Sequence, residues 1–240
     1  MSGPGSVASY RDARARVLER IAEACSRSGR DPASVSLVAV SKTVPAEHLR
    51  AAVEAGLDVL GENRVQEAAA KVAEVPGARG QLVGPLQTNK ARRAVEHFES
   101  IQSVDSIELG ERLDRMAGEV RPGGRYPILL QVNVDDDPAK AGFEVGDLAA
   151  AAERLGRLGS LEVLGLMTIG RLVTGAEAAR PTFRGLRELS GRLRAGGAPI
   201  GPALSMGMTD DFEVAVEEGA TIVRVGRALF GERDHDHRHD

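Results

Sequence analysis

Short apolar runs alternate with stretches of helical period along almost the whole chain. An opening helix is predicted over Val7–Ser28, because its apolar residues fall on one face and Gly29 follows as a C-cap. The first strand is predicted over Ser36–Ser41, a nearly continuous apolar run that is typical of a strand buried on both faces. Further strands are predicted at Asp58–Gly61, Gln81–Gly84, Ile101–Val104, Ile128–Asn133, Leu161–Met167, Ala203–Met206 and Thr221–Val225.

Helical stretches separate these strands, and Pro45 suits the first turn of the one that follows the first strand. Eight β/α units in 240 residues agree with a single (β/α)8 TIM barrel, and an open doubly wound sheet with fewer strands is the alternative. We expect the barrel with its N-terminal helix to occupy residues 1–234 and a polar, disordered tail to occupy residues 235–240. The helices are predicted at Pro45–Ala55, Arg64–Glu74, Thr88–Phe98, Ser106–Glu119, Val145–Leu158, Ala176–Ala195 and Asp210–Glu218.

Composition excludes several classes of function. The net charge of −4 provides no broad basic surface, and the scarcity of aromatic residues provides no stacking platform, so nucleic acid is not expected as a partner. No apolar run is long enough for a membrane span, and Cys25 alone cannot form an intrachain disulfide. We therefore expect a cytoplasmic protein without a membrane partner. The alternating His and Asp residues of the tail are more simply a solvated end than a metal site.

Basic residues are distributed unevenly, with 27 Arg and only 4 Lys. Lys42 directly follows the first buried strand, at the end of a barrel where active sites form. Burial there favours a neutral amine, which is the nucleophile that a Schiff base requires. The simpler alternative is a side chain that leaves the end of the strand for solvent.

Two glycine turns follow the last two strands, in Leu204–Asp211 and Ile222–Gly231. In a TIM barrel the loops after strands seven and eight commonly bind phosphate, and Ser205 would add a hydroxyl donor. Arg224 lies inside the last strand, where a guanidinium needs an acceptor. It would either pair with a carboxylate of the core or face a nitrogen or oxygen of a ligand ring.

Two other strand ends carry polar groups. Asn63 follows the second strand and would either cap the next helix or turn its amide toward a ligand. Lys140 lies in the acidic, turn-rich segment Asn133–Phe143, which we expect to be a mobile loop at the barrel mouth with a second amine. The consecutive aspartates of this segment point in different directions, so no metal site is predicted there.

Together these segments resemble, in order along the chain, the pyridoxal phosphate homeostasis proteins, also called the YggS-like or PROSC-like family. The resemblance extends from about Tyr10 to Arg233, and Gly61–Asn63 and Ser205–Met208 are its most diagnostic parts. Two departures are visible, since many members have His in place of Pro85 and often Thr in place of Arg227. The matching segments are Val40–Thr43, Gly61–Glu67, Gly84–Lys90, Lys140–Phe143, Gly165–Ile169, Leu204–Met208 and Val223–Gly226.

The resemblance implies the barrel of the alanine racemase N-terminal domain, which is fold type III among proteins that bind pyridoxal 5′-phosphate (PLP). It implies a Schiff base between Lys42 and the PLP aldehyde, with Arg224 facing the pyridine nitrogen. The cofactor-binding residues that it implies are Lys42, Asn63, Ser205, Met206, Gly207, Arg224, Gly226 and Arg227, of which Ser205 and the main chain of the two turns would hold the phosphate.

The family's function is to hold, buffer and deliver PLP without catalysis. The partners expected here are therefore PLP and, as recipients, PLP-dependent apoenzymes, with Lys140 or Lys90 as a secondary PLP acceptor. The oligomeric state expected is a monomer or weak homodimer. A small PLP-dependent racemase is the alternative, but it needs a proton acceptor on each face of its substrate, and Tyr10 and Tyr126 lie outside the motifs. A Schiff-base aldolase without a cofactor is a second alternative.

Overall fold

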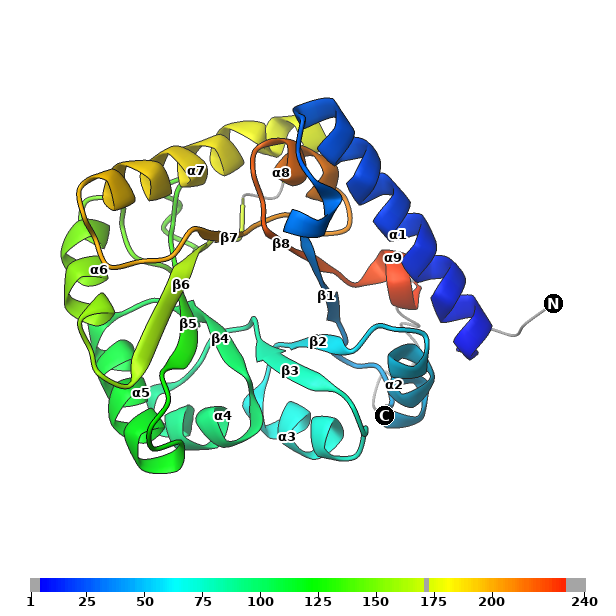
Figure 1. Ribbon diagram of the computed structural model, residues 1–240, viewed down its shortest axis with the longest axis horizontal. Coiled ribbons are helices and arrows are strands. Elements are labelled where there is room, and N and C mark those ends of the chain that lie inside the picture. The colour runs from blue at the N-terminus through cyan, green and yellow to red at the C-terminus, as the bar shows by residue number, and fades with distance from the viewer. Residues whose placement is uncertain (1–4, 171–172, 232–240) are drawn as a thin grey trace.

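The strands of the computed structural model, which describes residues 5–170 and 173–231, surround a common centre with helices outside them (Figure 1). Within these residues eight strands pair in parallel, and β8 pairs back to β1, so that the sheet closes into a barrel in sequence order. The TIM barrel prediction is confirmed, and the open sheet is wrong. The strands are β1 (Ser36–Val40), β2 (Val59–Glu62), β3 (Arg79–Leu82), β4 (Ser100–Val104), β5 (Tyr126–Gln131), β6 (Leu161–Met167), β7 (Ala203–Ser205) and β8 (Ile222–Val225).

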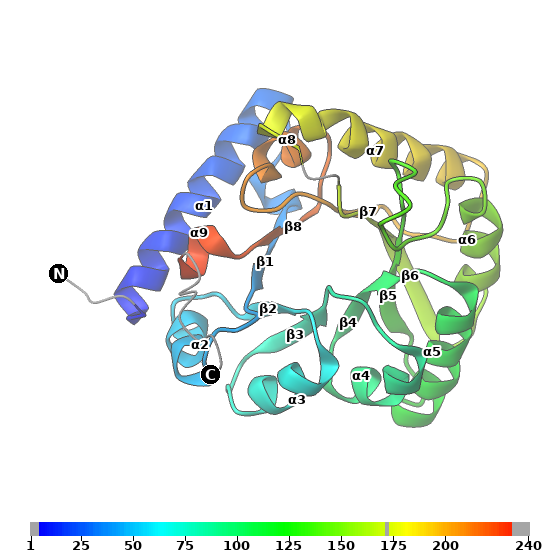
Figure 2. The same ribbon diagram turned by 180° about the vertical axis from the view of Figure 1, so that it is seen from behind.

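Helices connect successive strands and cover the outside of the barrel (Figures 1 and 2). The α-helices are α1 (Val7–Ser28), α2 (Ala46–Glu54), α3 (Val65–Ala73), α4 (Ala91–His97), α5 (Ile107–Val120), α6 (Leu148–Gly156), α7 (Arg180–Ala195), α8 (Phe212–Glu217) and α9 (Arg227–Phe230). Short 3₁₀ turns, η1 (Pro32–Ser34), η2 (Thr88–Lys90) and η3 (Ala176–Ala179), precede β1, α4 and α7.

Local chemistry accounts for the bounds of several elements. α1 matches the predicted range because the Ser6 side chain accepts from the Ser9 N–H at its start, and Gly29 takes the left-handed conformation, with φ 66°, at its end. Pro45 was predicted inside the first turn of α2 but occupies the N-cap, with the extended backbone that this position takes.

The register of the strands separates an inner from an outer face. Val38 is paired with Arg224, whose side chain reaches Ser205, so Val38 also faces the barrel interior. Gly61 lies on the same face, since a Cβ there would meet the side chain of Val38 at 2.8 Å. Side chains alternate along a strand, so Ala39 and Leu60 face the surrounding helices.

The first helix covers the seam where the barrel closes. Figure 2 shows α1 running past α8 and α9. Arg20 pairs with Glu213 at 2.9 Å and lies 4.5 Å from the ring centroid of Phe212, while the Tyr10 and Phe230 rings pack edge-on at 5.6 Å. These contacts join the beginning and the end of the described chain.

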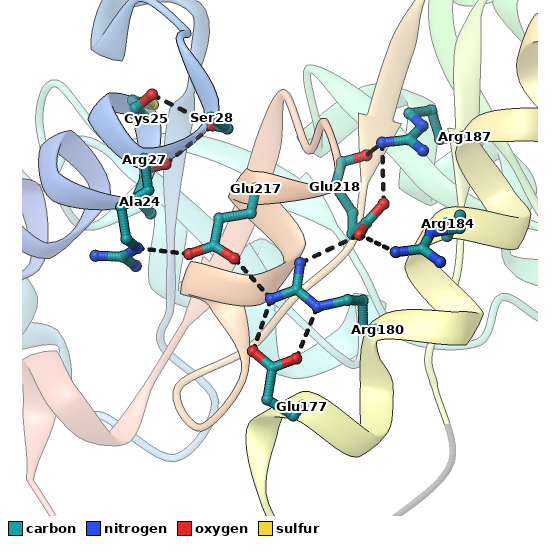
Figure 3. Close-up of polar contacts among 10 residues, drawn as sticks. All are labelled: Ala24, Cys25, Arg27, Ser28, Glu177, Arg180, Arg184, Arg187, Glu217 and Glu218. Carbon is teal, nitrogen blue, oxygen red and sulfur yellow. Dashed lines mark hydrogen bonds and ion pairs between the residues drawn. The ribbon is translucent and has the colours of Figure 1, made fainter.

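An outer ion network links α1, η3, α7 and α8 (Figure 3). Arg180, at the start of α7, bonds Glu177 at 2.6 Å, Glu217 at 2.6 Å and Glu218 at 3.1 Å. Glu218 is buried and also pairs with Arg184 and Arg187. The network consists of Arg27, Arg180, Arg184, Arg187, Glu177, Glu217 and Glu218.

The predicted polar tail, residues 235–240, lies outside the described residues. Within the part of the chain that is described, no helix combines the length and the apolar character needed to cross a bilayer.

Candidate functional site

A chain of polar side chains crosses the barrel interior, where layers of branched apolar residues are the usual filling. Gln102 of β4 donates through Nε2 to Gln81 Oε1 of β3 at 2.6 Å, and accepts at Oε1 from the Ser205 hydroxyl of β7 at 2.6 Å. Arg224 of β8 donates to Ser205 Oγ at 2.6 Å and to the Thr168 carbonyl oxygen at 2.8 Å. We call these four side chains, Gln81, Gln102, Ser205 and Arg224, the inner polar chain.

Arg224 supplies the charge of this chain. Burial lowers the pKa of its guanidinium to about 10, an effect that Asp211 partly opposes, so the group is still protonated at neutral pH. Across residues 5–170 and 173–231 no carboxylate forms an ion pair with it. Of the two interpretations left open by the sequence, the pair with a core carboxylate is therefore wrong. A cation held only by neutral acceptors creates a positive potential inside the barrel.

Lys42 follows β1 at the carboxyl end of the barrel. Val38 and Val40 face the interior, and Lys42 lies two residues after Val40 in the turn that follows Ser41. The residue is half-buried. Gly226 lies beside this strand end, because a Cβ there would be 3.4 Å from the Val40 carbonyl oxygen. The strand end that precedes Lys42 thus lies next to the turn after β8.

The two predicted glycine turns are neighbours in space. The Arg224 N–H donates to the Gly207 carbonyl at 3.0 Å, and the Gly226 N–H donates to Thr209 Oγ1 at 3.3 Å. Gly207 has φ 90°, and a Cβ there would lie 2.5 Å from that of Ala215, so only glycine fits. The strand order and these bonds bring the turns after β7, β8 and β1 together at one edge.

The residues predicted to bind phosphate fall into two groups: those whose donors are already engaged within the barrel, and those in the turns beyond the strand ends. The Ser205 hydroxyl is fully buried within the inner polar chain, and the Met206 N–H already donates to the Ile222 carbonyl at 3.1 Å. Gly207 and Gly226 lie beyond the strand ends. Arg227 begins α9, and its exposed side chain pairs with Asp210, so what it could offer a ligand here is its main chain.

Asn63 does not cap the helix that follows it. α3 begins at Val65, and the Ala68 N–H donates to the Arg64 carbonyl, so Arg64 holds the N-cap position. Asn63 lies one residue earlier, against Gly84, where a Cβ would meet the Asn63 carbonyl oxygen at 2.4 Å. The capping interpretation is wrong because the helix starts one residue later than that role requires.

Sequence reasoning missed a cluster behind Lys42. Glu62 at the end of β2 is buried, and its Oε1 lies 2.8 Å from Nζ of Lys71 on α3. Both residues bond Ser41, which directly precedes Lys42. The scarcity of lysine in this chain was the signal that could have drawn attention to Lys71 as well as to Lys42.

The loop after β5, which we expect to be mobile, is closed by hydrogen bonds within the segment. The Phe143 N–H donates to the Gln131 carbonyl at 2.8 Å, and the Asn133 side chain both donates to and accepts from the main chain of Asp137. The inward Gln131 side chain donates to the Ala141 carbonyl at 2.8 Å. Lys140 is therefore held on the rim of the barrel at the end of β5.

The remaining candidates lie elsewhere. Lys90 ends η2 beside an open depression that it lines with Arg92, Arg93 and His97 of α4. Tyr126 begins β5, at the amino end of the barrel, where its hydroxyl donates to the Phe98 carbonyl at 2.9 Å and burial raises its pKa. Tyr10 Oη lies 3.3 Å from His48 Nδ1, outside the barrel.

Known proteins share this fold and sequence. Residues 15–234 match the family described as alanine racemase, N-terminal domain. A pyridoxal phosphate homeostasis protein from Pseudomonas aeruginosa is 45% identical over 225 residues, covering 92% of this chain and 94% of its own. A protein of the same name from Aquifex aeolicus is 42% identical over 220 residues, covering 91% of this chain and 96% of its own.

Solved structures show the same similarity. PipY from Synechococcus elongatus, solved with PLP bound, has a TM-score of 0.77 and 45% identity, covering 90% of this chain and all (100%) of its own. An alanine racemase from Clostridium difficile has a TM-score of 0.68 at 13% identity over 91% of this chain and 60% of its own, which shows a common fold. The identities over nearly the full length establish that this chain belongs to the family of pyridoxal phosphate homeostasis proteins.

Proposed function

We propose that this protein binds PLP as a Schiff base on Lys42 and holds, buffers and delivers it rather than using it in catalysis. The observation that carries the proposal is the position of Lys42, two residues after the end of β1, where Val40 lies beside Gly226 in the turn after the strand that carries Arg224. The names of the family members and the PLP-bound structure of PipY support the choice of ligand.

The residues present fit PLP on two counts. Lys42 supplies a primary amine at the carboxyl end of the barrel, and the guanidinium of Arg224 has no carboxylate partner among the described residues. PLP supplies an aldehyde that condenses with amines and a ring that stabilises carbanions when its nitrogen is protonated. Asn63, Ser205, Gly207, Gly226 and the main chain at Met206 and Arg227 complete the set that we propose around it.

Arg224 favours holding over catalysis. It stays protonated at neutral pH, because its pKa of about 10 is lowered by burial but remains well above 7. If it lies against the pyridine nitrogen, as the family resemblance implies, its charge opposes protonation of that nitrogen. The ring is then a weak acceptor of electrons, which disfavours demanding carbanion chemistry.

The positions of the tyrosines weigh against a racemase. Such an enzyme needs a second proton acceptor across the substrate from the lysine. Tyr126 is buried at the amino end of the barrel, and Tyr10 lies outside it on α1. A racemase would exchange the α-proton of an amino acid in deuterated water, and we expect no exchange. We also expect the protein to act in the cytoplasm and to pass PLP to PLP-dependent apoenzymes.

The test is to load the purified protein with PLP, reduce it with borohydride and map the modified peptide. We expect visible absorbance before reduction and a reduced adduct on the peptide that contains Lys42. Lys42→Ala should lose both, whereas Lys90→Ala and Lys140→Ala should keep the adduct on Lys42. A colourless wild-type protein that carries no adduct would contradict the proposal and favour a cofactor-free aldolase.

The same variants test the secondary acceptors. If Lys140 or Lys90 receives PLP during transfer, its replacement by alanine slows transfer to an apoenzyme without changing the adduct on Lys42. Unchanged transfer kinetics in Lys140→Ala would remove that lysine from the proposal.

A further inference from the structure

A buried ion pair lies on the outer face of the barrel wall, directly behind Lys42. Glu62 is 1% exposed, and the Lys71 side chain is 14% exposed, with Nζ of Lys71 and Oε1 of Glu62 at 2.8 Å. Ser41 and Glu62 project outward toward α3, while Val40 and Gly61 face the interior. The pair therefore does not line the interior of the barrel.

Both members of the pair hold Ser41. Lys71 Nζ donates to the Ser41 carbonyl oxygen at 2.7 Å, and the Ser41 hydroxyl donates to Glu62 Oε1 at 2.6 Å. The Ser41 N–H donates to the Gly61 carbonyl at 2.9 Å. The donor and acceptor groups of Ser41 are thus all engaged, and its carbonyl belongs to the peptide that it shares with Lys42.

The residue after Lys42 is also constrained. Thr43 has φ 68°, in the left-handed region that a β-branched residue rarely adopts. The Val44 N–H donates to the Ser41 carbonyl at 3.1 Å, which closes the turn around Lys42 and Thr43. Such a conformation persists only where its surroundings fix it, and here the fixed group is Ser41.

We propose that the Glu62–Lys71 pair is a positioning device for the amine of Lys42. It anchors the main chain on the outside of the wall, so that the Lys42 side chain leaves the inner face in one direction. Stability alone does not account for the pair, because apolar residues of similar volume are often as stable as a buried ion pair. The inference rests on the proposed function, since it takes Lys42 as the PLP anchor.

Two probes separate positioning from binding. PLP carries the aldehyde that condenses with Lys42, whereas pyridoxine 5′-phosphate has the same ring and phosphate with an alcohol that cannot condense. In the double variant Glu62→Gln with Lys71→Met, both charges are removed and no buried charge is left unpaired. We expect the rate of condensation with PLP to fall about tenfold, because a small misplacement of a reacting group has effects of this size or larger. The Kd of pyridoxine 5′-phosphate should stay within about twofold, because its binding needs no reaction at Lys42.

A matched control removes another buried hydrogen bond at the same end of the barrel. Ser103→Ala deletes the bond from Ser103 Oγ to the Gly84 carbonyl, at 2.6 Å, on the β3–β4 side. It should lower Tm without slowing condensation. Lys71→Arg, which keeps a positive charge and N–H donors at this position, should retain most of the wild-type rate.

The outcomes separate this inference from the proposed function. Normal condensation by the double variant, or equal weakening of both probes, would overturn the positioning role. Absence of any adduct in the wild-type protein would overturn the proposed function itself.

Discussion

The barrel holds its arginines in two contrasting environments. In the outer ion network (Figure 3), Arg180 contacts three carboxylates, and hydrogen bonds to Glu177 and Glu217 raise its pKa. In the inner polar chain, Arg224 contacts a hydroxyl and a carbonyl, and burial lowers its pKa to about 10. The outer charges neutralise one another and join helices, whereas the inner charge is held by neutral acceptors.

The contrast follows from the cost of burying charge. An ion pair at the surface costs little and contributes modestly to stability. A fully buried cation without a counter-ion opposes folding, and residues that break such a rule are typical of functional sites. We therefore expect a change at Glu218, the buried acceptor of the outer network, to alter stability without altering PLP binding, and changes in the inner chain to do the reverse.

The largest effect is expected for Glu218→Ala. Three arginines lose their shared buried acceptor, which should lower the free energy of unfolding by about 2 kcal/mol and Tm by about 4–8 °C. This loss is somewhat smaller than that expected on breaking a fully buried ion pair. The affinity for PLP should not change. Glu177→Ala is the control, since its side chain is 74% exposed, and it should leave Tm nearly unchanged. Loss of PLP binding in Glu218→Ala would remove the distinction between the two environments.

Arg224→Gln should show the opposite pattern. The amide can still donate within the inner polar chain, but the charge is gone, so we expect the affinity for PLP to fall about tenfold, or about 1.4 kcal/mol. Tm of the PLP-free protein should change little or rise, because an unpaired buried charge is removed. Titration calorimetry measures the affinity for PLP, and thermal unfolding measures the Tm of the PLP-free protein. A large fall in Tm without a change in affinity would show that Arg224 is structural.

The smallest effect is expected from acid. Hydrogen bonds from Arg180 lower the pKa of Glu177 and Glu217, and although burial alone would raise that of Glu218, bonds from Arg184 and Arg180 lower it. Groups whose pKa is lowered on folding stabilise the folded state at neutral pH. This contribution is lost as the pH falls from about 5, through their ordinary pKa values and then their lowered ones. Tm should therefore decrease over this range.

Other groups help to isolate the network's share of this acid sensitivity. Burial raises the pKa of Asp105 and of Asp211, which acts in the opposite sense, and Arg224 stays protonated throughout. The comparison is therefore with Glu218→Gln, whose Tm should fall less steeply with acid than that of the wild type. Equal slopes would mean that the outer network does not carry the acid sensitivity.

Periodicity predicted the fold well because each element carries its own signal. The bounds of α1 and β6 agree with those expected, since a capping serine and glycine frame the first and a dense apolar run marks the second. Errors occur where ends depend on neighbours. β3 was expected from Gln81 but begins at Arg79, whose N–H donates to the Asp58 carbonyl that precedes β2.

The site was predicted only in part. Lys42 could be found from its place after a buried strand in a lysine-poor chain. The bond from Ser205, which accepts from Arg224, to Gln102 could not, because these two residues are 103 positions apart in the sequence and meet only across the interior of the barrel. Lys71 was missed for a related reason, since its contact with Ser41 depends on how α3 packs on the barrel wall.

The pairing of β8 with β1 has a consequence for biosynthesis. β1, which precedes Lys42, is the first of the eight barrel strands to be synthesised, and β8, which carries Arg224, is the last. A nascent chain can therefore bring these two residues together only after β8 has been synthesised. A polypeptide that lacks β8 would hold Lys42 without the neighbouring strand that carries Arg224.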